Sequence, residues 1–340
     1  MFDFSSALDL PLIFGIIIAA AIFLYVLLDG FDLGIGIIFP FAPSDKCRNR
    51  MMNSIAPFWD GNETWLVMGG GGLFAAFPLA YSILLPAFYI PITAMLFGLI
   101  MRGVAFEFRF KAEGKYRNFW GYIFHIGSVS AAFFQGVILG AFVNGVEVDG
   151  HDFSGSAFDW LSGFSVMTGI ALIFGYALLG ATWLIMKTED VTQKWSREIA
   201  PYLAIVVAVF MTLVSIIMPF LNEEVRNFWF SVPDIYYLAP IPLFTFFLFA
   251  VLWFDLKKPH KEYRPFLLTI AIFLMGYIGI GISFYPWIVP FQYNIWNAAA
   301  SSQSLSLLLV GVIPLLPIIL GYTAYSYYVF RGKTSHEHFY

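Results

Sequence analysis

Nine long apolar stretches, separated by short polar segments, dominate this sequence. They cover approximately residues 10–39, 54–77, 80–104, 118–145, 160–186, 199–221, 236–254, 265–289 and 304–330. A transmembrane helix needs about 20 consecutive, mostly apolar residues. The pattern therefore predicts an all-α polytopic membrane protein with about nine transmembrane helices.

The composition leaves no room for a large soluble domain. Hydrophobic residues make up 60% of the 340 residues and charged residues only 12%, whereas soluble domains carry about 25% charged residues. A net charge of −4 gives no reason to expect a nucleic-acid partner. The single cysteine, Cys47, excludes an intrachain disulfide and a cysteine metal cluster.

The basic residues predict how the chain is oriented. Of the 18 Lys and Arg residues, all but Arg226 fall in or beside alternate loops and in the C-terminal tail, and so on one side of the membrane. Basic loops face the cytoplasm in membrane proteins. We therefore expect an external N-terminus and a cytoplasmic C-terminus, as an odd number of spans requires.

Four carboxylates lie within or at the ends of the first two apolar stretches. They are Asp29 and Asp32 in LLDGFDLGIG, and Asp60 and Glu63 in SIAPFWDGNETW. An ionised group at membrane depth costs about 2.5–3.5 kcal/mol on insertion scales. These groups must therefore face protein or water, or stay protonated, and an ion or proton pathway is the default interpretation.

The spacing of the four acids places them in one half of the protein. Asp29 and Asp32, three residues apart, lie on neighbouring faces near the inner end of the first span. If the second span begins near residue 54, Asp60 lies about 9 Å and Glu63 about 14 Å along it. We expect all four on the cytoplasmic side. The alternative for each is a structural role, as a cap or an ion pair.

Several neighbours could support these acids. Arg102, at the end of the third span, is the expected countercharge, with Glu107 just beyond it. Asn62, Trp59 and Trp65 could form hydrogen bonds or simply pack. The later spans have apolar interiors and are interpreted as scaffold.

Histidine raises the question of metal ligation. Of the five histidines, only His125 falls within a predicted span. It is a weak candidate ligand, because a lone membrane histidine without a facing partner is more often hydrogen-bonded.

Three segments together resemble subunit II of the cytochrome bd quinol oxidases. They are LLDGFDLGIGIIFPF, RMMNSIAPFWDGNETWLVMGGGGLFAAFPLAY and LIMRGVAFEFRFK. The similarity is dense from about residue 25 to 120, and the block containing WDGN is highly specific.

The resemblance implies a place in a respiratory complex of the bacterial cytoplasmic membrane. The partner, subunit I, would carry two haems b, a further haem d or b, and the quinol-oxidising loop. The heterodimer would reduce oxygen to water with cytoplasmic protons, without pumping, and small single-helix subunits could join it. This chain would contain no catalytic residue and no haem ligand. It would form two four-helix bundles plus one extra helix, divided here into 1–150, with the acids, and 151–340.

The resemblance also implies roles for individual residues. Asp60, the Asp of WDGN, would take part in proton uptake, with Glu63 and Asn62 supporting the route. Asp29 and Asp32 match the DGFD motif and would lie along or beside a second hydrophilic path. Two other interpretations remain: a proton-coupled secondary transporter, and a scaffold that only stabilises a partner. Transporters commonly repeat their broken helices in both halves, whereas this acidic cluster has no counterpart after residue 150.

Overall fold

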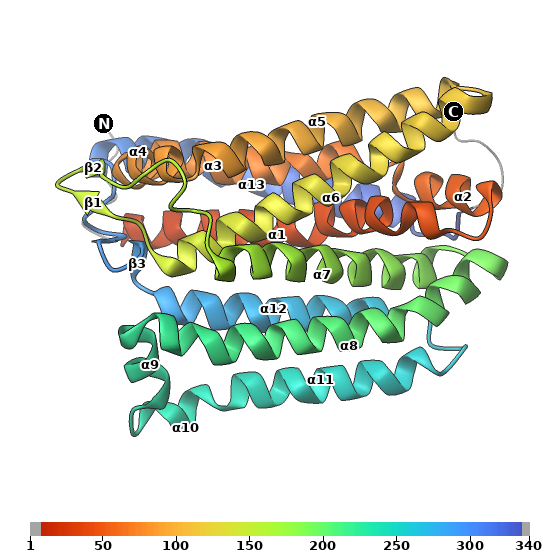
Figure 1. Ribbon diagram of the computed structural model, residues 1–340. Helices are drawn as coiled ribbons and strands as arrows, with labels where there is room; N and C mark the ends of the chain where they lie inside the picture. Colours follow the sequence, from red (N-terminus) through yellow and green to blue (C-terminus); the bar gives the residue numbers. More distant parts are fainter. Residues whose placement is uncertain (1–7, 335–340) are drawn as a thin grey trace.

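Long helices lie side by side along one direction in the computed structural model, which describes residues 8–334 (Figure 1). Eight helical segments are long and apolar enough to span a membrane, which confirms an all-α polytopic membrane protein. The long helices are α1 (Leu10–Ile38), α5 (Tyr89–Lys111), α6 (Gly114–Asn144), α7 (Gly163–Lys187), α8 (Asp190–Leu221), α11 (Pro240–Leu256), α12 (Arg264–Phe284) and α13 (Ser302–Val329).

Short elements connect the long helices. The helical ones are η1 (Phe39–Phe41), α2 (Asp45–Ile55), α3 (Trp59–Ala76), α4 (Pro78–Ala87), α9 (Glu223–Phe230) and α10 (Asp234–Leu238). Two small antiparallel hairpins pair β1 (Val148–Asp149) with β2 (Asp152–Phe153), and β3 (Trp287–Val289) with β4 (Tyr293–Asn294). The division of the chain at residue 150 stays a prediction.

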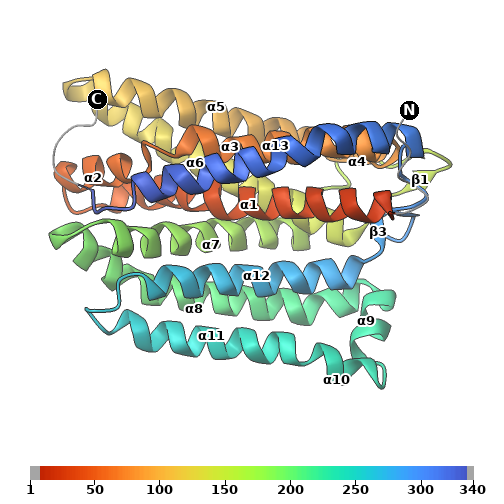
Figure 2. The ribbon, with the colours of Figure 1, turned by 180° about the vertical axis from the view of Figure 1, so that it is seen from behind.

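The second predicted span, 54–77, is wrong as a single helix. Residues 54 and 55 end α2, and a new helix, α3, begins at Trp59. After Phe77 the chain continues in α4 and reverses only at Phe88, so the predicted third span, 80–104, begins too early. Pro78 looks like a loop signal, but it occupies the first turn of α4, where a missing N–H costs nothing. In both views α3 and α4 follow one another along the bundle, so the chain between α2 and α5 forms two consecutive helices (Figures 1 and 2).

The two ends of the bundle have different loops. The α5–α6 turn, the α7–α8 junction and the α11–α12 connection lie at the same end as α2. This end, named the basic end here, carries the lysines and arginines that the sequence predicts on one side. The small hairpins, α9 and α10 lie at the opposite end (Figures 1 and 2).

Helices α1 and α7 touch backbone to backbone through glycine. A Cβ at Gly34 would lie 1.8 Å from the carbonyl oxygen of Tyr176, and one at Gly180 would lie 2.5 Å from the carbonyl carbon of Gly34. In a lipid environment the hydrophobic effect contributes little to the association of helices, so association depends on close packing. Small residues at the contact allow this close packing. The contact fixes the part of α1 that carries Asp29 and Asp32 within the bundle.

A set of hydrogen bonds at the basic end, the tail latch, holds the end of α13. Lys187 Nζ, at the end of α7, donates to the carbonyls of Phe330 and Gly332. Lys333 Nζ donates to Glu262 Oε1 at 2.9 Å. The tail latch joins the last helix to the α7–α8 junction and the α11–α12 connection.

The glycine contact yields a first prediction. Gly34→Ala should lower the thermal stability of the detergent-solubilised protein by about 3 kcal/mol or more, because the backbone must move to admit the methyl group. Gly279→Ala is the control, since a Cβ there meets nothing within 4 Å. An equal response of the two variants in a thermal unfolding assay would contradict the close contact.

The tail latch yields a prediction about pH. The pKa of Glu262 lies below its ordinary value because Lys333 and Gln193 donate hydrogen bonds to its carboxylate. Because folding lowers this pKa, the ionised carboxylate stabilises the tail latch at every pH above the ordinary pKa of glutamate. This stabilisation is lost as the pH falls through the pKa of the folded state.

We expect Glu262→Gln to increase amide exchange at the end of α13 at neutral pH. The wild type should show the same increase only in acid, after correction for intrinsic exchange rates. The exposed Glu198 serves as control through Glu198→Gln. Unchanged exchange in Glu262→Gln would contradict the latch.

Candidate functional site

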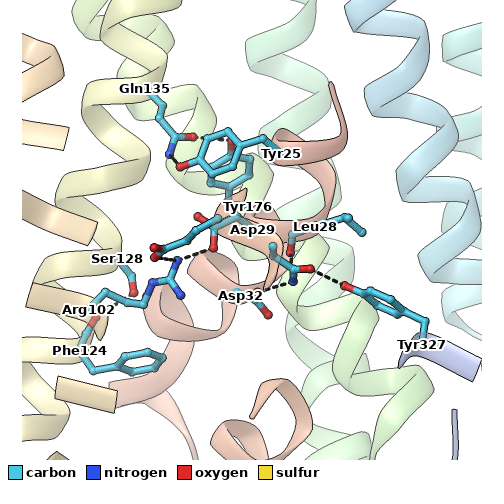
Figure 3. A network of polar contacts seen from close by, with 12 residues as sticks. Tyr25, Leu28, Asp29, Asp32, Arg102, Phe124, Ser128, Gln135, Tyr176 and Tyr327 are labelled. Atoms are coloured by element: carbon cyan, nitrogen blue, oxygen red, sulfur yellow. Dashed lines mark hydrogen bonds and ion pairs between the residues drawn. The ribbon is translucent and has the colours of Figure 1, made fainter. Parts of the chain in front are cut away.

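A buried arginine lies between two of the predicted acids. Arg102 of α5 is fully buried, and its Nη2 atom forms ion pairs with Asp29 Oδ1 of α1 and, at 2.8 Å, with Glu63 Oε1 of α3 (Figure 3). The Arg102 guanidinium also lies 5.4 Å from the ring centre of Trp59. The countercharge expected at Arg102 is therefore present, and it joins three helices.

Close packing of α5 on α6 sets the position of Arg102. A Cβ at Gly127 would lie 2.7 Å from the backbone nitrogen of Arg102, and one at Gly98 would lie 2.7 Å from the nitrogen of Ala131. The two backbones approach as closely as small residues allow. The side chain of Arg102 therefore starts at this close helix contact, and its guanidinium reaches Asp29 of α1.

Asp32 belongs to a second set of contacts. Its Oδ2 accepts a hydrogen bond from Asn62 Nδ2 at 2.7 Å, and the same amide nitrogen lies 3.1 Å from the carbonyl of Leu28. Tyr327 of α13 donates to Asn62 Oδ1 at 3.0 Å. Asp29 and Asp32, on neighbouring faces of α1 as their spacing predicts, thus contact different helices.

A third set extends away from Asp29 toward α6 and α7. Gln135 Nε2 donates to the hydroxyl of Tyr25 at 2.6 Å, and Tyr176 donates to Gln135 Oε1 at 2.6 Å (Figure 3). Tyr25 precedes Asp29 by one helical turn, on the same face of α1. The buried polar groups therefore continue beyond the carboxylates.

Asp60 does not join the buried groups. It lies in the first turn of α3 and its side chain is exposed, whereas Glu63, one turn later, is 30% exposed. The neighbouring Asn62 contacts Asp32, so this turn lies inside the length of the bundle. Glu107 is also exposed, on α5 near the basic end, and lies outside the buried cluster.

The remaining candidates pack or bond locally. Trp65 is buried against Ala21 and Tyr25. His125 Nδ1 shares a hydrogen bond of 3.0 Å with the carbonyl of Gly36. Among residues 8–334, no group of three His, Cys, Asp or Glu side chains could hold a metal ion.

Sequence reasoning missed Tyr25, Gln135, Tyr176 and Tyr327. The sequence could have indicated Gln135 as a buried polar residue, because its amide lies within an otherwise apolar stretch of α6. Tyr25 lies four residues before Asp29. No sequence feature near Tyr176 or Tyr327 indicates contact with the first helices, since aromatic residues are 20% of the chain.

The arrangement can hold and relay protons. The carboxyl groups of Asp29 and Glu63 share one guanidinium, and that of Asp32 lies on the next face of α1. Asp29 Oδ2 and Asp32 Oδ1 are buried and have no hydrogen-bond partner among the described residues. Buried polar atoms of this kind are usually satisfied by ordered water. Carboxyl groups, water and tyrosine hydroxyls can all pass protons over hydrogen-bond distances.

Fold and site define a polytopic helical membrane protein with a buried network of ionisable groups near its N-terminal helices. Residues 10–330 match the family described as cytochrome bd terminal oxidase subunit II. The chain belongs to this family and is a subunit of a terminal oxidase, an oxidoreductase complex of respiratory electron transport.

Individual relatives cover nearly the whole chain. It is 30% identical over 332 residues to cytochrome bd ubiquinol oxidase subunit 2 of Bacillus subtilis, covering 94% of this chain and 96% of the relative. It is 28% identical to cytochrome bd-I ubiquinol oxidase subunit 2 of Escherichia coli, covering 96% of each. A chain of the bd oxidase structure from Geobacillus thermodenitrificans superposes with a TM-score of 0.75, at 18% identity, over 95% of this chain and 99% of that chain. That structure supports the fold.

The buried ion pairs yield a further prediction. Arg102→Gln should destabilise the protein by about 3–5 kcal/mol, because Asp29 and Glu63 lose their shared cation inside the bundle. Adding Asp29→Asn to this variant should recover part of the loss, a coupling that a double-mutant cycle of thermal stability would measure.

The control is Arg226→Gln, which breaks an exposed pair with Glu223 and should cost less than about 1 kcal/mol. Strict additivity of the Arg102 and Asp29 effects would contradict the coupling.

Proposed function

We propose that this chain is the haem-free subunit II of a quinol oxidase. It is required for assembly and helps to deliver protons for the reduction of oxygen to water. The partner, subunit I, would hold two haems b and a haem d or b, and would oxidise the quinol. The complex would be electrogenic without pumping. Membership of the family supports the subunit assignment, and the names of the relatives support quinol as the electron donor.

One observation supports the proton-uptake role: burial of the acidic side chains increases from Asp60 through Glu63 to Asp29. Asp60 is exposed on α3, Glu63 is 30% exposed one turn later, and Asp29 is buried behind it with Arg102 between them. Asp32 continues the series on the next face of α1, held by Asn62. A proton accepted at Asp60 would reach the bundle interior through Glu63.

The exposure of Asp60 also supports a partner subunit. On the same helix Val67 is 72% and Phe74 is 61% exposed, so the outer face of α3 is apolar beyond its first turn. A carboxylate at this depth is unfavourable against lipid. We propose that subunit I covers this face and that Asp60 lies at the interface between the subunits.

We propose that this chain holds no haem, with His125 as the one weak candidate ligand. Nδ1 of His125 is engaged in a hydrogen bond with the backbone carbonyl of Gly36, and among residues 8–334 no group of three His, Cys, Asp or Glu side chains could hold a metal ion. We propose that subunit I holds the haems and that this chain contributes to the reaction through proton delivery alone.

We propose that the basic end faces the cytoplasm of the bacterial cell, with the N-terminus outside. The positive-inside rule supports this orientation. Arg102, Glu63 and Asp60 then lie on the side from which protons are taken, and the tyrosines of the third set of contacts lie deeper.

Asp60→Asn tests the proposal in the assembled complex. Quinol oxidase turnover should fall at least about tenfold, since a positioned proton-transfer group contributes about 10²–10⁴-fold. Haem content should be unchanged in a reduced-minus-oxidised spectrum. The matched control is Glu107→Gln, an exposed acid outside the cluster, which should keep full turnover. Full turnover and unchanged proton uptake in Asp60→Asn would remove Asp60 from the route.

A further inference from the structure

A hollow of about 130 Å³ lies at the basic end, between η1 and the α5–α6 turn. It is separate from the buried acids. Its lining includes Arg48, Arg109, Arg117, Phe39, Gly121 and Tyr122. Three guanidinium groups thus converge on a single small space.

Two of these arginines lack an acidic partner. Arg109 Nη1 lies 3.1 Å and Arg117 Nη2 lies 2.7 Å from the same acceptor, Asn49 Oδ1. In the described part of the chain, neither arginine forms an ion pair, and both Nε atoms are buried without a hydrogen-bond partner. Only Arg48 has a carboxylate, pairing with Asp45 at 2.6 Å.

Burial makes this arrangement unfavourable without an anion. Arg109 is only 2% exposed, and its guanidinium lies over the Phe39 ring at 4.9 Å. A buried charge needs a paired countercharge, and one amide oxygen shared by two cations does not supply it. Guanidinium groups present forked donors that match the oxygens of a phosphate.

The surroundings of the hollow indicate where such a phosphate comes from. Phe119, Tyr122 and Ile126 of α6 are all at least half exposed, and their spacing puts them in one stripe on that helix. Tyr122 also lines the hollow, so the stripe starts at its mouth. Phe41, after α1, is exposed as well. Aromatic side chains concentrate at the headgroup level of membranes, and basic pockets between transmembrane helices bind anionic headgroups.

We propose that this hollow binds the phosphate group of an anionic phospholipid. Arg109 and Arg117 donate to the phosphate oxygens, and the acyl chains lie along the stripe of Phe119, Tyr122 and Ile126. The lipid then joins η1 to the α5–α6 turn at the basic end. The site is independent of proton uptake, because none of its residues contacts the buried acids.

The test uses the purified complex after delipidation in detergent. Thermal stability is titrated with phosphatidylglycerol, with zwitterionic phosphatidylcholine and with inorganic phosphate. The test variants are Arg109→Gln and Arg117→Gln. The matched control is Lys115→Gln, which removes one exposed positive charge from the same turn. Arg117 is only partly buried, so its variant keeps the test usable if Arg109→Gln does not assemble.

We expect phosphatidylglycerol to stabilise the wild type and Lys115→Gln saturably at the same concentration. The two arginine variants should need at least about a tenfold higher concentration of phosphatidylglycerol for the same stabilisation, since each loses a charge-assisted hydrogen bond. Native mass spectrometry should show a retained anionic lipid on the wild type that the arginine variants lose. Equal responses of all variants would overturn the site. Equal protection by inorganic phosphate, or by phosphatidylcholine, would overturn the assignment to an anionic lipid.

Discussion

The cost of holding charge inside an apolar bundle is the constraint on which this structure depends. Arg102 and Asp29 are both buried, and Glu63 completes the cluster from a third helix. A buried ion pair is weak evidence for stability, because apolar residues of similar volume often do as well or better. The cluster therefore argues for a function that needs ionisable groups at this depth. It also fixes helix register, since moving any of the three helices would leave a charge unpaired.

Glycine contacts and the tail latch hold this cluster from two directions. Gly34 and Gly180 bring α1 against α7, and Gly127 brings α6 against the backbone of Arg102. At the basic end, the tail latch fixes α13, which carries Tyr327 to Asn62. The polar network thus rests on packing between helices that are distant in sequence.

Much of this was readable from the chain itself. The apolar stretches predicted the spans outside residues 54–104, and the spacing of Asp29 and Asp32 predicted neighbouring faces. The distribution of charge pointed to Arg102 as the countercharge. The break between α2 and α3 had a sequence signal in Pro57, since proline interrupts helices, but the prediction followed the apolar run on both sides of it. The outward direction of Asp60 was not readable, since the rotation of α3 about its axis is set by tertiary contacts. Tyr176 and Tyr327 reach the network only through the packing of α7 and α13, which leaves no local sequence mark.

The contact between Tyr327 and Asn62 has a consequence for biosynthesis. The two residues are 265 positions apart, and chains grow at about 5–20 residues per second. The amide that holds Asp32 therefore emerges roughly 13 to 50 s before its tyrosine partner exists. During that interval the first helices are inserted with an incomplete polar interior. A ribosome that stalls before the last helix releases a chain whose acidic centre lacks this partner, which gives membrane quality control a feature by which to recognise unfinished copies.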